Sequence, residues 1–172
     1  MRTLLFLAAT FFAVSMAHSQ TVEQYESSGY AKHLSKNYAG AIADFTKAIE
    51  IDPTRDESYN HRGNAKAKLE DYRGAILDYT KSIEFCPIEL ISSPYFNRGV
   101  AKAKLEDYRG AILDFNKVIE SDPPSFTNAA TYYHRGLAKL NLGLKDSGCL
   151  DLSKAGELGH ADAYDTISES CK

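Results

Sequence analysis

The sequence lacks an excess of charge of either sign. Its 172 residues include 20 lysines and arginines against 23 aspartates and glutamates, so the formal net charge is −3. Basic side chains are interleaved with acidic ones, and no basic stripe forms that would attract a phosphate backbone. The composition therefore argues against nucleic acid as a partner. A 44% share of apolar residues and a 25% share of charged ones are ordinary values for a globular domain.

Motifs that carry catalysis or bind metals are also missing. The sequence contains no H-E-x-x-H, G-x-S-x-G or C-x-x-C. The stretch from Gly143 to Gly148 has the glycine spacing of a phosphate-binding loop, but Cys149 and Leu150 follow where lysine and a hydroxyl are required. Serine, histidine and aspartate are scattered without the arrangement that nucleophilic catalysis requires. We expect no enzyme activity, no cofactor and no bound metal.

Long apolar runs are rare, and one lies near the start, from Leu4 to Ala17. With Arg2 before it and small residues after it, the run is typical of a secretory signal peptide. We expect residues 1–19 to be the signal, cleaved after Ser19, with cleavage after Ala17 as the alternative. A membrane helix needs about 20 residues, so an uncleaved anchor is less favoured. The mature protein should have no integral membrane span and should be exported, to the periplasm or beyond the cell.

A repeat is the main feature that the sequence does have. The segment from Ala65 to Asp78 recurs without change from Ala101 to Asp114, thirty-six positions later. Glycines recur at steps of 34, 36 and 37 residues, at Gly29, Gly63, Gly99 and Gly136. Prolines close three of the copies, at Pro53, Pro87 and Pro123. A period of this size indicates a stack of small structural units, each meeting the same kind of neighbour.

Each copy has the apolar spacing of two helices. In one copy Ala75, Ile76, Tyr79 and Ile83 fall on one helical face, and a second helical pattern precedes them. The pattern is interrupted between the two segments, and the closing proline prevents continuation. The unit is therefore two antiparallel helices, and stacking buries apolar stripes that neither helix could bury alone.

The period, together with particular residues of one copy, resembles the tetratricopeptide repeat; these are Tyr59, Gly63, Tyr72, Ala75, Tyr79 and Pro87. The resemblance implies an all-α fold, a right-handed superhelical stack of helix-turn-helix repeats with a C-terminal capping helix. Within residues 20–160 we place four repeats, at about 22–55, 56–89, 92–125 and 129–160. Residues 161–172 form the cap. The first and fourth copies depart from the pattern, as terminal repeats do.

Arginine and aspartate recur sixteen residues apart, as Arg62 with Asp78, Arg98 with Asp114 and Arg135 with Asp151. In a hairpin whose turn lies midway, such residues stand at equal height on facing helices. We interpret them as structural ion pairs rather than ligand-binding groups. The first copy has Asp44 but carries Ser28 where the arginine should be, so its acid lacks that partner.

Cysteine is scarce, with three in the sequence. Cys149 and Cys171 lie symmetrically about a turn expected near residue 160, at equal height on antiparallel helices. In an oxidising compartment we expect a disulfide that fastens the cap. The alternative is that Cys149 is a small buried apolar residue, because isoleucine occupies its position in the earlier copies. Cys86 replaces an aspartate of the other loops, and pairing between chains is one role open to it.

The resemblance implies that the first helix of each unit lines a concave groove. The residues that it places there are Tyr30, His33, Asn60, Asn64, Lys68, Phe96, Val100, Lys104, Tyr133 and Leu137. Phe96 beside Tyr133 would provide aromatic anchors for a peptide or a helix, unless the cap or the longer loops cover them. Relatives that bind peptide carboxylates use a lysine and asparagine clamp. Asn60, Asn64 and Lys68 resemble it only loosely, so that specificity is not transferred.

These patterns predict an exported, non-enzymatic protein–protein interaction scaffold of the cell envelope. Its partner would be a protein or peptide ligand bound in the groove. The alternative is a structural repeat protein that self-associates, through the apolar end of the groove or through Cys86. A third reading, an accessory subunit of an envelope enzyme or secretion complex, differs from the first only in the identity of the partner.

Overall fold

The computed structural model describes residues 21–87, 91–121 and 126–172. The expected signal peptide and its cleavage site lie outside these residues. The described chain is helical and contains no strand. It begins in a helix over residues 21–34 and continues with α2 (Tyr38–Ile51), α3 (Asp56–Lys68), α4 (Tyr72–Phe85), α5 (Ser92–Lys104), α6 (Tyr108–Ser121), α7 (Phe126–Asn141), α8 (Lys145–Glu157) and α9 (Ala163–Ser170).

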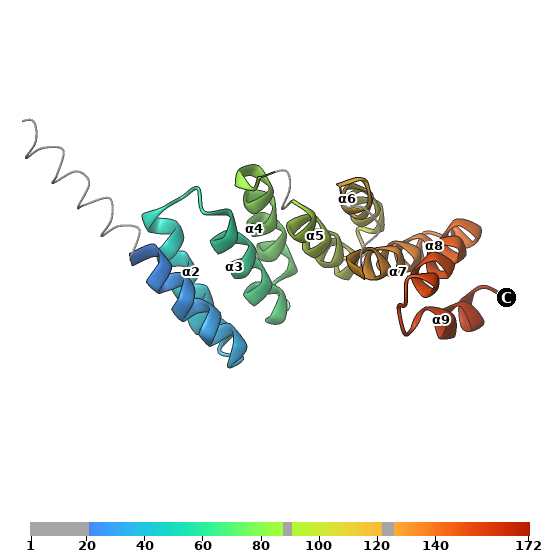
Figure 1. The fold of residues 1–172 in the computed structure, drawn as a ribbon, viewed down its shortest axis with the longest axis horizontal. Coiled ribbons are helices and arrows are strands. Elements are labelled where there is room, and N and C mark those ends of the chain that lie inside the picture. The colour runs from blue at the N-terminus through green and yellow to red at the C-terminus, as the bar shows by residue number, and fades with distance from the viewer. Residues whose placement is uncertain (1–20, 88–90, 122–125) are drawn as a thin grey trace, which may run out of the picture.

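Consecutive helices pair into hairpins, and the hairpins stack side by side into an elongated array that ends at α9 (Figure 1). We number the hairpins as repeats: repeat 1 is the helix over residues 21–34 with α2, repeat 2 is α3 with α4, repeat 3 is α5 with α6, and repeat 4 is α7 with α8. Each second helix packs against the first helix of the next repeat. The expected all-α stack of helical hairpins is confirmed.

The fourteen repeated residues build the turn of the hairpin. Glu70 takes a left-handed backbone conformation with φ of 62°, and Asp71 then caps α4 by accepting a hydrogen bond from the Gly74 amide at 2.9 Å. A side chain at Gly74 would collide with the Asp71 carboxylate. Repeat 3 uses the same three residue types in the same way. The identity of the two segments therefore reflects one turn built twice.

Glycine in the middle of each first helix lets the two helices approach. A Cβ atom at Gly63 would lie 2.7 Å from a ring carbon of Tyr79, which is almost fully buried. The same contact joins Gly99 with Phe115 and Gly29 with Phe45. Buried aromatic rings thus fill the space left by glycine, and this packing offsets the lower helix propensity of glycine, about 1 kcal/mol relative to alanine.

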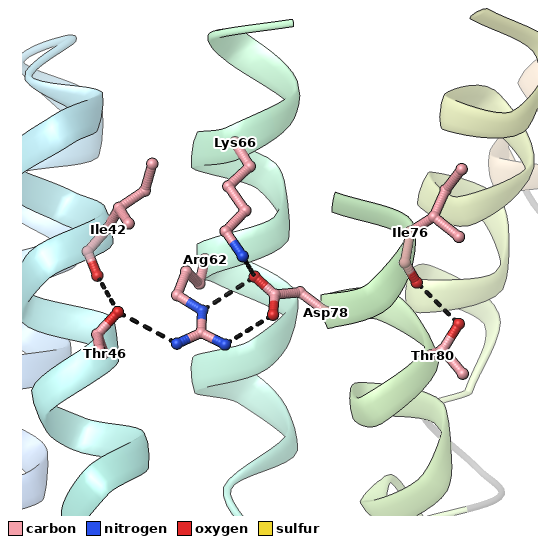
Figure 2. A network of polar contacts seen from close by, with 7 residues as sticks. All are labelled: Ile42, Thr46, Arg62, Lys66, Ile76, Asp78 and Thr80. Atoms are coloured by element: carbon pink, nitrogen blue, oxygen red, sulfur yellow. Dashed lines mark hydrogen bonds and ion pairs between the residues drawn. The ribbon is translucent and has the colours of Figure 1, made fainter. Parts of the chain in front are cut away.

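A buried ionic cluster joins the two helices of repeat 2 to each other and to repeat 1 (Figure 2). Arg62 donates two hydrogen bonds to the Asp78 carboxylate, at 2.9 and 2.7 Å, and Lys66 approaches the same carboxylate at 2.8 Å. The remaining Arg62 amino group donates to the Thr46 hydroxyl at 3.1 Å, across the junction with repeat 1. Thr46 in turn donates to the carbonyl of Ile42 at 2.7 Å, so each polar group has a partner.

The same cluster recurs in repeats 3 and 4, and the three predicted ion pairs are confirmed. Sequence reasoning missed two parts of it: the lysine one turn after each arginine, and the hydrogen bond to the preceding repeat. Repeat 1 keeps the lysine of the cluster without its arginine, because Lys32 occupies the position of Lys66 and lies 2.6 Å from Asp44, whereas Ser28 occupies the position of Arg62. Burial alone would raise the pKa of Asp44, but hydrogen bonds from Lys32 and Ser28 outweigh it and lower the pKa.

The last repeat is covered by α9, a helix of eight residues. A helix this short is unstable by itself in water. A disulfide joins Cys149 of α8 to Cys171, just after α9, with Cα atoms 5.9 Å apart. In the segment that leads into α9, the His160 ring stacks on Tyr133 at 4.0 Å. The pairing of Cys149 with Cys171 is the one that the sequence favours. No helix in the described part of the chain is long and apolar enough to cross a membrane.

Candidate functional site: a groove along the first helices

Two adjoining cavities follow the first helices of successive repeats. The larger, about 420 Å³, is lined by residues of the helix over 21–34 and of α3, α4, α5 and α7. The smaller, about 260 Å³, is lined by α5, α7 and the start of α6. They share Val100 and His134 as lining residues. We treat them together as the groove.

Seven of the ten residues assigned to the groove from sequence line it: His33, Asn64, Lys68, Phe96, Val100, Lys104 and Leu137. The other three lie elsewhere. Tyr30 is half exposed and meets His61 edge-on, with ring centroids 5.8 Å apart. Asn60 lines a different cavity, between repeats 2 and 3.

Tyr133 corrects the expectation of an exposed aromatic pair. Its ring stacks on His160 at 4.0 Å, and its hydroxyl lies 3.3 Å from the Thr166 hydroxyl of α9. The segment leading into the cap therefore covers Tyr133, the alternative that the sequence left open. The position of Tyr133 along α7 matches that of Phe96 along α5, but only repeat 4 is followed by a cap.

An aromatic cluster forms one wall of the groove. The Phe96 ring meets the His134 ring at 5.5 Å in an edge arrangement, and His134 stacks over the buried Phe115 at 6.1 Å. In repeat 2, His61 stacks over Phe45 in the same way, at 5.5 Å. Sequence reasoning missed His134 as a groove residue, although its recurrence with His61 was a signal that both histidines cover the core aromatic of the preceding repeat.

The groove floor presents amide donors. The buried Tyr79 hydroxyl donates to the side-chain oxygen of Asn64 at 2.9 Å, which leaves the Asn64 amino group for other acceptors. Burial raises the pKa of Tyr79, so this hydroxyl keeps its proton at physiological pH. Amide N–H groups suit carbonyl or carboxylate oxygens of a ligand.

The charge of the groove is one-sided. Lys68 and Lys104 end their helices at matching positions one repeat apart, and both side chains are exposed. Among the described residues that line the groove, none is aspartate or glutamate. Burial, followed by the charges of His160 and Lys104, lowers the pKa of His134, so this ring is neutral near pH 7 and the lysines dominate the field.

The described residues contain no group of three or more histidine, cysteine, aspartate or glutamate side chains that could hold a metal ion. What the groove offers is two ammonium groups, amide donors and an aromatic wall. These groups can hold a ligand by charge, hydrogen bonds and apolar contact.

Family comparisons agree with this architecture. A family model described as a TPR repeat matches residues 29–70, and one described as a tetratricopeptide repeat matches residues 56–88 and 92–125. The chain belongs to the tetratricopeptide repeat family. Tetratricopeptide repeat proteins are in general non-catalytic scaffolds for protein–protein interaction, and the fold supports that broad role here. A search of the curated proteins finds no match.

Solved structures of the same fold superpose over most of the chain. MamA from Desulfovibrio magneticus RS-1 has a TM-score of 0.77 at 18% identity, covering 88% of this chain and 86% of that one. The first TPR of Spaghetti (RPAP3), bound to the HSP90 peptide SRMEEVD, has a TM-score of 0.67 at 22% identity, covering 73% and 95%. The TPR2B domain of yeast Sti1, in a pHsp70 complex, has a TM-score of 0.62 at 20% identity, covering 73% and 98%. The likeness at these identities is one of fold.

Proposed function

We propose that this protein is a non-enzymatic scaffold that binds an extended segment of a partner protein in the groove. The observation that carries the proposal is the one-sided chemistry of the lining: Lys68 and Lys104 at matching positions, amide donors on the floor and no carboxylate among the described lining residues. A segment with acidic side chains or a terminal carboxylate complements this surface. Phe96 and Val100 offer an apolar contact for one of its side chains.

Two proteins of similar fold have been solved in complexes with an HSP90 peptide and with pHsp70, which supports a peptide-binding role for this fold. The lysines of this chain are spaced by one whole repeat, so a ligand that touches both must be extended over several residues. That requirement favours a flexible segment or a chain terminus over a folded surface.

We also propose that the protein acts outside the cytoplasm, in the cell envelope. The apolar run from Leu4 to Ala17 after Arg2 supports export, and the Cys149–Cys171 disulfide is of a kind that persists in oxidising compartments. The test is fractionation of the source cells with mass measurement of the recovered protein. We expect a chain that begins at Gln20. A full-length chain recovered from the cytoplasm with reduced cysteines would contradict the proposal.

A peptide library tests the groove. Random peptides with free and with amidated C-termini are selected against the purified protein, and we expect enrichment of acidic sequences with one large apolar residue. The double variant Lys68→Glu, Lys104→Glu should lose binding. Arg73→Glu, Arg109→Glu is the matched control, because these exposed arginines lie outside the groove and carry the same total charge. Equal binding by both variants would exclude the groove as the site.

Self-association is the second candidate, and exposed leucines favour it. Leu77, Leu113 and Leu150 occupy matching positions on the second helices and are 69%, 65% and 72% exposed. Sedimentation over a wide range of protein concentration decides between the two functions. A monomer at every concentration rules out self-association, whereas an oligomer that Leu77→Lys, Leu113→Lys dissolves would make it the primary function.

A further inference from the structure

A cavity of about 320 Å³ lies at the junction of repeats 2 and 3, apart from the groove. Its walls come from the first two turns of α3, the end of α4 and the start of α5. Asp56 and Glu57 supply two carboxylates, and Cys86, just after the end of α4, also lines the space. None of the described lining residues is lysine or arginine. We refer to this space as the junction cavity.

Ser82 is the unusual residue of the junction cavity. It is fully buried, and its hydroxyl has no hydrogen-bond partner among the described residues. The other repeats place Ala48, Val118 and Ala155 at the same position, and each of these is fully buried and apolar. A buried hydroxyl without a partner destabilises the fold. Packing alone would favour alanine here, so the hydroxyl points to an interaction with a group from outside the chain.

The preceding junction, between repeats 1 and 2, contains an internal cation at the matching place. Arg55 donates to the Glu26 carboxylate from two nitrogens, at 3.2 and 2.6 Å, and the Ser58 hydroxyl donates to the same carboxylate at 2.6 Å. Glu26 occupies the position that Asn60 has one repeat later. Burial opposes the charge of Glu26, but the hydrogen bonds from Arg55 and Ser58 lower its pKa. This junction is thus built around a guanidinium group.

The second junction has neither partner of that ion pair, since Asn60 replaces Glu26 and Ile91 replaces Arg55. Its acidic groups are instead Asp56 and Glu57, which line the space, and none of its described lining residues carries a guanidinium group. Neither acid forms an ion pair with another described residue. Arg55, which precedes Asp56 in the chain, interacts electrostatically with Glu57 but directs two of its nitrogens to Glu26.

We propose that the junction cavity binds the guanidinium group of an arginine from a partner protein. Asp56 and Glu57 would provide the opposite charge, and the Ser82 hydroxyl, which is closed off from solvent in the free protein, would accept a hydrogen bond from the guanidinium edge after a small movement of the cavity wall. The site complements the groove, whose lining is basic. A hydrogen bond from Asn97 to Asn60, at 3.2 Å, separates the two spaces. The proposal does not depend on what occupies the groove.

Cys86 provides a reporter inside the junction cavity. Its thiolate attacks the sulfenyl sulfur of a methanethiosulfonate reagent, forms a mixed disulfide and releases methanesulfinate. The rates with the cationic 2-aminoethyl reagent and the anionic 2-sulfonatoethyl reagent are followed by mass spectrometry. We expect the ratio of the two rates to fall on the order of tenfold in Asp56→Asn, Glu57→Gln. Asp165→Asn, Glu169→Gln in α9 is the control of equal charge, and its ratio should match the wild type.

Competition then tests the chemical class of the ligand. N-acetyl-arginine amide should slow alkylation of Cys86 by neutral N-ethylmaleimide, and N-acetyl-citrulline amide, the uncharged isostere, should not. Ser82→Ala should weaken this protection while raising the melting temperature. Equal protection by the two amides would overturn the proposal, and so would a rate ratio that is unchanged in Asp56→Asn, Glu57→Gln. A Cys86 thiol that neither methanethiosulfonate reagent modifies would also overturn it, since a closed cavity cannot admit a side chain.

Discussion

Repeats 2 and 4 are built on one plan and differ in how closely their helices approach. Both place an arginine and a lysine on a buried aspartate, with nearly the same distances. Repeat 2 sets Gly63 against the large Tyr79 ring, whereas repeat 4 sets Gly136 against the smaller Leu152 and against the backbone of Gly148. The ionic cluster is therefore the constant part of the unit, and the size of one facing side chain determines the spacing of the helices.

The two repeats also differ in their C-terminal neighbours. Repeat 2 is covered by α5 of the next repeat, while repeat 4 is covered by the eight residues of α9 and a disulfide. A full repeat buries enough apolar surface to stay in place through packing. A single short helix does not, so a covalent link replaces part of that packing.

Removing an arginine of the ionic cluster should cause the largest loss of stability. In Arg98→Met the carboxylate of Asp114, whose side chain is 4% exposed, keeps only Lys102. We expect a loss of about 4 kcal/mol in the free energy of unfolding, because a buried charge loses its main partner. Urea titration followed by circular dichroism measures it. Lys32→Met in repeat 1 is the comparison, and it should cost less because that lysine is 38% exposed. Equal losses would contradict the view that burial is what makes the ionic cluster contribute strongly to stability.

Removing the covalent link should come next. In Cys149→Ser, Cys171→Ser we expect a loss of about 3 kcal/mol, the value typical of a loop of this length. Hydrogen exchange should show that α9 opens first, with Tyr133 becoming accessible as His160 moves away. Unchanged protection of α9 in the double variant would mean that packing alone holds the cap.

Gly148→Ala tests the close approach in repeat 4. Alanine is the residue at this position in the other repeats, as Ala41, Ala75 and Ala111. Here its Cβ would lie 3.0 Å from the carbonyl oxygen of Gly136 and equally close to Leu140. We expect a net loss of about 1 kcal/mol, since strain exceeds the gain in helix propensity. Thermal unfolding checks this, and a rise in melting temperature would show that the helices can separate.

The pH dependence of stability should show the smallest effect. Burial holds the pKa of His134 in the folded protein below its usual value of 6.5. The unfolded chain therefore binds a proton first as the pH falls, so the stability present above pH 6.5 declines as the pH drops toward the folded pKa. His134→Asn introduces the residue that repeat 3 has at this position, Asn97. In this variant the unfolding midpoint should change less with pH than in the wild type. The measurement runs from pH 7.5 to 5.5, about one unit on either side of the ordinary histidine pKa. An unchanged slope would assign the effect to other groups.

Much of the groove was predictable from sequence because the repeat places equivalent residues on equivalent faces. Seven of the ten assigned residues line it, since register within a first helix determines which side chains share a face. The misses have specific causes. Tyr133 has the position of a groove residue along its helix, but the segment leading into the cap covers it, and only repeat 4 has such a cap. Asn60 lines the junction cavity instead of the groove.

The sequence by itself determined the helical hairpins and the pairing of Arg62 with Asp78, because these depend on separations along the chain and on the position of a turn. The tertiary structure alone decided which groups from different repeats meet: Thr46 with Arg62, and His134 with Phe115. These contacts depend on how far one hairpin is rotated and shifted against the next. That geometry is set by the packing of many side chains together, so it cannot be predicted from the sequence separation of any two residues.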